Sequence, residues 1–176
     1  MFSNEYIFRQ VEETRKKYWT RDPYELLGSI GAEVHFTREF SPEGLKGYCT
    51  VIKRIKIAVI NGFLNEWERR MVAGHEAGHL ILHMNEIYRS PVRALRDFHV
   101  LSETGRIERE ANMFLADFML TDDDVMESVS NEYNDIYSSA RELGVLPELL
   151  AFKLYSMNQR DYRVRCPIDL NSKFLG

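Results

Sequence analysis

The pattern that most constrains the fold of this chain is H-E-x-x-H at residues 75–79. The segment around it, from residue 66 to about residue 85, has helical character. Histidines four positions apart on a helix lie one turn apart on nearly the same face, so His75 and His79 can hold one small cation. Glu76 is the next residue round the helix and can reach a metal-bound water without being a ligand. The motif predicts a zinc-dependent hydrolase, and a peptidase in particular.

Extended segments precede this predicted helix, and helical segments follow it. In residues 55–60, Ile55, Ile57 and Val59 alternate with Lys56, Ala58 and Ile60, which is the period of a strand with one buried face. We expect strands over about residues 33–37, 47–52 and 55–60, and helices over about 4–18, 22–31, 66–85, 105–120, 132–143 and 147–157, with a short helix after Thr121. Residues 86–104 are expected to form a long loop. This order predicts an α+β fold that is mostly helical, with a small antiparallel sheet before the helix of the motif.

Composition narrows the class of protein. Hydrophobic residues make up 44% of the chain and charged residues 28%, as in ordinary soluble domains. The net charge of −4 and the lack of a long basic run argue against direct binding of nucleic acid. We expect no signal peptide, because the N-terminus lacks a basic segment followed by an apolar core. We expect no membrane segment, because no apolar run approaches the roughly 20 residues that a membrane helix needs. We therefore expect a cytoplasmic protein whose two cysteines, Cys49 and Cys166, are reduced thiols.

The sequence contains no repeat and no low-complexity linker. We therefore expect a single domain over residues 1–176, with a helical C-terminal part from about residue 121.

A catalytic zinc usually takes three protein ligands, so one more ligand must come from outside the motif. The candidates are Glu108, Glu110, His83 and His99. His83 lies one further turn along the same helix, and three ligands along one straight helix span too much length to converge. Glu108 and Glu110 are about 200° apart round their helix, so only one of them can face the metal. Helical phase places Glu108 nearer the apolar face and favours it, but Glu110 stays open.

Three segments resemble the ImmA/IrrE family of metallopeptidase-like proteins. They are Val-Ile-Asn at residues 59–61, His-Glu-Ala-Gly-His-Leu-Ile-Leu-His at residues 75–83, and Glu-Arg-Glu-Ala-Asn-Met-Phe-Leu-Ala at residues 108–116. The likeness extends over about residues 5–157. One departure is Phe-Met-Leu-Thr at residues 118–121, which lacks the proline that is usual there. The resemblance implies a zincin-like metallopeptidase domain.

The resemblance also implies a more specific function. Such proteins are zinc-dependent proteases that cleave a DNA-binding repressor and relieve repression in mobile elements, prophages or stress responses. Carried over by position, His75, His79 and Glu108 would bind Zn²⁺, and Glu76 would be the general acid/base. The partner would be a separate helix-turn-helix repressor. Two alternatives remain: a regulatory protein that sequesters a repressor or toxin without cleaving it, and a zinc hydrolase for small substrates.

Two further expectations concern the substrate. The strand at residues 55–60 is expected to offer its edge to an extended peptide. Tyr88, Arg93 and His99 are candidates for stabilising the transition state.

Overall fold

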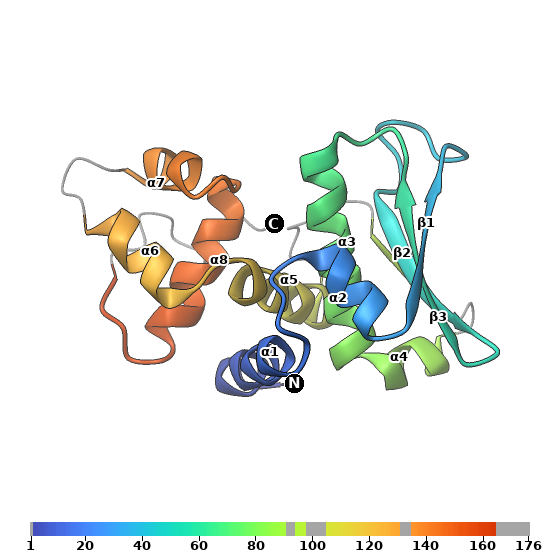
Figure 1. Ribbon diagram of the computed structural model, residues 1–176, viewed down its shortest axis with the longest axis horizontal. Helices are drawn as coiled ribbons and strands as arrows, with labels where there is room; N and C mark the ends of the chain where they lie inside the picture. Colours follow the sequence, from blue (N-terminus) through green and yellow to red (C-terminus); the bar gives the residue numbers. More distant parts are fainter. Residues whose placement is uncertain (1, 91–93, 98–104, 131–134, 165–176) are drawn as a thin grey trace. The chain divides into compact units, whose positions relative to one another are not determined.

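The structure is a computed structural model that describes residues 2–90, 94–97, 105–130 and 135–164. Its elements in chain order are α1 (Asn4–Tyr18), α2 (Pro23–Ser29), β1 (Ala32–Thr37), β2 (Gly47–Ile52), β3 (Ile55–Asn61), α3 (Glu66–Leu82), α4 (Met84–Arg89), β4 (Ala94–Asp97), α5 (Arg106–Met119), α6 (Asp122–Val129), α7 (Ile136–Glu142) and α8 (Pro147–Asn158). This confirms the predicted α+β class (Figure 1). Within the described part of the chain, no helix is both long enough and apolar enough to cross a membrane.

The chain packs as two compact units. One consists of Met1–Thr14 together with Leu101–Gly176, and the other is Arg15–Val100. The second unit holds the sheet and α3, and the described part of the first is helical.

The sheet has four strands in the order β1-β3-β2-β4. A two-residue turn joins β2 to β3, and both of its residues, Lys53 and Arg54, have positive φ, as a type I′ hairpin requires. The predicted antiparallel pairing is confirmed for β2 and β3. β1 instead pairs in parallel with β3, because the hairpin brings β3 back alongside β1 in the same direction. The sheet is therefore mixed.

Two expectations for this unit are wrong. β3 lies between β1 and β2, which occupy both of its edges, so it cannot accept a substrate as an added strand. Residues 86–104 are not a plain loop either, since α4 reaches Arg89 and β4 pairs with β2. The local pattern gave no sign of β4, because its pairing depends on a partner more than forty residues earlier in the chain.

Helix α3 is fixed at its start by a capping box. The Asn65 side chain accepts a hydrogen bond from the Glu68 backbone N–H, and the Glu68 carboxylate accepts one from the Asn65 N–H. The helix packs against β2, β3 and α2. Asn61, fully buried at the end of β3, donates to the carbonyls of Ser41 and Leu45. These bonds hold the segment before β2 against the strand that leads to α3.

The helical unit contains a buried ion network. Lys153 of α8 is fully buried, and its Nζ lies 2.9 Å from Asp117 Oδ1 and 2.6 Å from Asp122 Oδ1. Arg160 donates two hydrogen bonds to Asp122, and Ser156 donates one to Asp117. Burial alone would raise the pKa of Asp122, but hydrogen bonds and charge from Arg160 and Lys153 outweigh it and hold that pKa well below its usual range. The network ties α5, the start of α6 and α8 together.

Candidate metal centre

The two histidines of the motif meet at one point beside α3. His75 Nε2 and His79 Nε2 lie 2.9 Å apart, and both side chains are almost completely buried. The ring planes are inclined at 83° in a T-shaped arrangement, so the two rings do not stack. The predicted i, i+4 arrangement on a helix is present in the structure.

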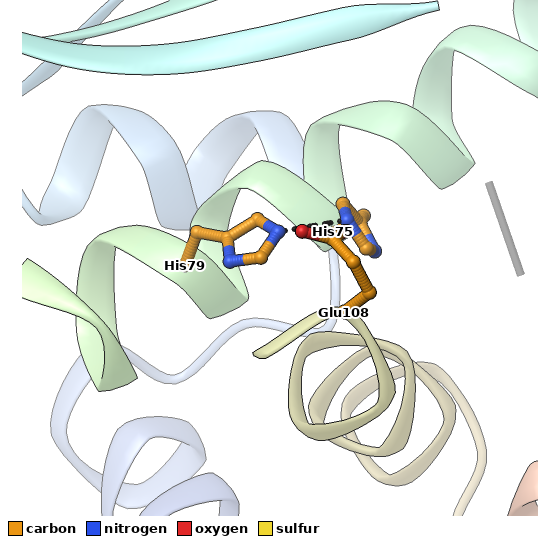
Figure 2. A group of neighbouring side chains, drawn as sticks. All are labelled: His75, His79 and Glu108. Atoms are coloured by element: carbon orange, nitrogen blue, oxygen red, sulfur yellow. Dashed lines mark hydrogen bonds between the residues drawn. The ribbon is translucent and has the colours of Figure 1, made fainter. Parts of the chain in front are cut away.

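Glu108, in the first turn of α5, is the third member of this group. One ligand atom from each of His75, His79 and Glu108 lies within 4.8 Å of the other two. Figure 2 shows the Glu108 carboxylate directed toward the two imidazole nitrogens.

The donor set fits zinc. Two imidazoles and one carboxylate are a common ligand set for catalytic zinc, which leaves the fourth position for water. Nitrogens that bind one zinc tetrahedrally lie about 3.4 Å apart, so the 2.9 Å between the two Nε2 atoms needs only a small adjustment.

Glu110 has different surroundings from Glu108. Its carboxylate accepts a hydrogen bond of 3.0 Å from the backbone N–H of Phe2 and forms an ion pair of 3.2 Å with Arg106. The side chain is almost completely buried. The carboxylate of Glu110 therefore has a structural task, the anchoring of residue 2 to α5, and it is not a member of the His-His-Glu group.

Glu76, which follows His75 in sequence, is fully buried, and β2 passes close to it. A Cβ atom at Gly47 would lie 2.4 Å from Val72 Cγ1 and 3.0 Å from Glu76 Oε1. Only glycine allows this approach of strand to helix. Gly47 belongs to none of the motifs that point to the site. Its one signal in the sequence is a glycine in a predicted strand, which often marks a close approach of the backbone.

None of the remaining candidate residues that the structure describes belongs to the His-His-Glu group. His83 is fully buried at the junction of α3 and α4, with its Nδ1 3.1 Å from His79 Nδ1. It faces the far nitrogen of His79, on the other side of that ring from His75, so it is not a third ligand at the same point. Tyr88 is half exposed on α4. Arg93 and His99 lie outside the described residues.

Comparison with known families agrees with this geometry. The family model described as Peptidase_M78, IrrE N-terminal-like domain, matches residues 30–155. This protein belongs to that family. The matched range of the Peptidase_M78 domain contains His75, Glu76, His79 and Glu108. The resemblance to the ImmA/IrrE family is thereby confirmed, and with it membership of a family of metallopeptidases.

A relative of this Peptidase_M78 protein is the "Uncharacterized immunity region protein 2" of Bacillus phage phi105. The two are 34% identical over 123 residues, which cover 70% of this chain and 73% of the relative. No solved structure matched the chain.

Proposed function

We propose that this protein is a zinc-dependent endopeptidase that cleaves a DNA-binding transcriptional repressor and so relieves repression. The observation that carries the proposal is the convergence of His75, His79 and Glu108 within 4.8 Å, beside the buried Glu76. Membership of a metallopeptidase family supports the peptidase reaction. The name of the phage relative, which refers to an immunity region, supports a regulatory target.

Each residue has a role in this reaction. His75, His79 and Glu108 would hold Zn²⁺, which when bound supplies a Lewis acid for the scissile carbonyl and makes water acidic near neutral pH. The Glu76 carboxylate would accept a proton from the attacking water and deliver it to the leaving amine. Burial of Glu76 against β2 restricts the positions that its carboxylate can take. The repressor would be a separate helix-turn-helix protein, bound through protein contacts without nucleic acid.

The decisive experiment uses Glu76→Gln, which removes the base and keeps the side-chain shape. The protein is incubated with each helix-turn-helix repressor encoded in the same genome, with zinc or with a chelator, and fragments are identified by mass spectrometry. Wild type should produce fragments only without chelator. Glu76→Gln should retain zinc yet slow cleavage by about 10²- to 10⁴-fold, the usual contribution of a general acid–base group.

The matched control is Glu66→Gln, an exposed glutamate at the start of the same helix. It should cleave at the wild-type rate. Cleavage by Glu76→Gln at the wild-type rate would show that the role given to Glu76 is wrong. A stable complex with a repressor that yields no fragments, with or without chelator, would instead favour sequestration.

A further inference from the structure

We infer that His83 is a positioning residue for the metal centre: its Nδ1 accepts a hydrogen bond from His79 Nδ1–H and so fixes the ring orientation and tautomer of His79. This inference rests on the proposed zinc site. It assigns a role to a histidine that helix geometry argues against as a third ligand. All the atoms that carry it lie on α3 or at its end.

One ring nitrogen of His79 faces His75, and the other faces His83. His79 directs Nε2 toward His75 Nε2 at 2.9 Å, which leaves Nδ1 as its second nitrogen. A neutral imidazole carries one proton, and a metal ligand must offer an unprotonated nitrogen. If Nε2 of His79 binds the metal, its proton is therefore on Nδ1. The group that Nδ1 meets is His83 Nδ1, at 3.1 Å.

The hydrogen bond from His79 also determines the tautomer of His83. Since His79 Nδ1 donates, His83 Nδ1 must accept, which places the His83 proton on Nε2. The two ring planes are inclined at 52° with centroids 5.2 Å apart, so the rings are tilted and not stacked. Metal-binding histidines usually have such a partner on their second nitrogen, most often a carboxylate or a carbonyl. A neutral ring in that place orients His79 without adding a further buried charge.

An acceptor orients a metal ligand only if the acceptor is itself held in place. The His83 backbone N–H donates to the His79 carbonyl at 2.8 Å, and the His83 carbonyl accepts from the Ile87 N–H at 3.0 Å. His83 therefore ends α3 and begins α4, bonded to both. Its side chain is fully buried, which leaves the ring little freedom to turn away.

The test compares two replacements of His83 that differ in one property. The amide oxygen of His83→Asn can take the place of Nδ1 and accept the same hydrogen bond, whereas His83→Leu has similar bulk and no acceptor. We expect zinc affinity close to wild type in His83→Asn and about 10- to 100-fold weaker in His83→Leu, the usual cost of losing such a partner. Affinity is measured by competition with a chromophoric chelator. His35→Leu, at an exposed histidine of β1, is the control and should bind zinc as wild type does.

A purely structural role for His83 predicts a different outcome. Wild-type affinity in His83→Leu, or an equal loss in both His83 variants, would overturn the inference. Circular dichroism of the metal-free variants shows whether each is folded. The wild-type protein gives a second readout through two-bond ¹H–¹⁵N spectra of its histidine rings. With zinc bound, His79 should be protonated on Nδ1 and His83 on Nε2, and a proton on Nδ1 of His83 would overturn the inference without any variant.

The results separate this inference from the proposed function. If the variants bind zinc in the expected pattern but no repressor is cleaved, the protease proposal is contradicted and the role of His83 is still supported. Repressor cleavage by His83→Leu at wild-type zinc affinity would contradict the role of His83 and support the protease proposal. A wild-type protein that binds no zinc would overturn both.

Discussion

Glu108 and Glu110 lie two positions apart on α5 and have different neighbours. Glu108 belongs to the group with His75 and His79, while Glu110 is bonded to Phe2 and Arg106. We predict that Glu108→Gln lowers bound zinc to well below one equivalent, because a neutral amide is a poor zinc ligand. Glu110→Gln should keep its zinc. Metal content of the purified variants, measured by mass spectrometry, tests both; loss of zinc in Glu110→Gln alone would reverse the choice of ligand.

The roles of some residues could be predicted from the sequence, and the roles of others could not. Spacing placed His75 and His79 on one face, and helical phase favoured Glu108, because both arguments need only the geometry of one helix. The same geometry excluded His83 as a ligand but could not reveal its bond to His79, which depends on where α3 ends. Lys153 shows the limit in another way: a lysine is ordinarily exposed, and only its two aspartate partners explain its complete burial.

At the scale of elements, local signals identified most helices and strands. β2 and α1 have the predicted bounds, since hairpin and helix patterns are contained in short stretches of sequence. β4 and the parallel partner of β3 required contacts between distant segments, which periodicity does not encode. The predicted free edge of β3 failed for the same reason. The expectation that residues 1–176 form a single domain stays a prediction.

The approach of β2 to α3 predicts a strong effect of Gly47→Ala. The added Cβ would overlap Val72 Cγ1 and crowd the Glu76 carboxylate. We expect a loss of about 1–3 kcal/mol in the free energy of unfolding, typical of overpacking, and slower cleavage because Glu76 must move. Urea unfolding and the cleavage assay measure the two effects.

The control for Gly47→Ala is Gly28→Ala. Gly28 lies in α2, and its added Cβ would have no neighbour within 4 Å. Alanine there should leave cleavage unchanged and raise stability by about 0.5–1 kcal/mol, because glycine is the poorer helix former. Equal behaviour of the two variants would contradict the close approach at Gly47.

At the scale of the whole molecule, stability should depend on the buried ion network of the helical unit. We predict that Lys153→Met lowers the free energy of unfolding by about 3 kcal/mol, because Asp117 then remains buried without its nearest cation. Lys16→Met, at an exposed lysine of α1, should change it little. Urea unfolding of both variants, in chelator to remove any effect of zinc, provides the measurement. A loss in Lys153→Met no larger than in the control would contradict the role of the network.

The lowered pKa of Asp122 adds a dependence on pH. A carboxyl group whose pKa is lower in the folded protein than in the unfolded chain stabilises the fold above its ordinary pKa, and this contribution is lost as pH falls. We therefore expect the free energy of unfolding to drop below about pH 4. Asp122→Asn should be less stable near neutral pH and show a shallower acid loss. Urea unfolding in chelator at several pH values tests this, and parallel curves for the two proteins would contradict it.

The same network also has a thermal consequence. Water solvates ions less favourably as temperature rises, so the cost of burying Lys153 and its aspartate partners becomes smaller on heating. Apolar burial gains no comparable advantage, since its strength per unit area levels off. The contribution of these charges to holding α5, α6 and α8 together should therefore become more favourable on warming. Heating would therefore reduce the free-energy cost of the buried charges, which is larger at room temperature.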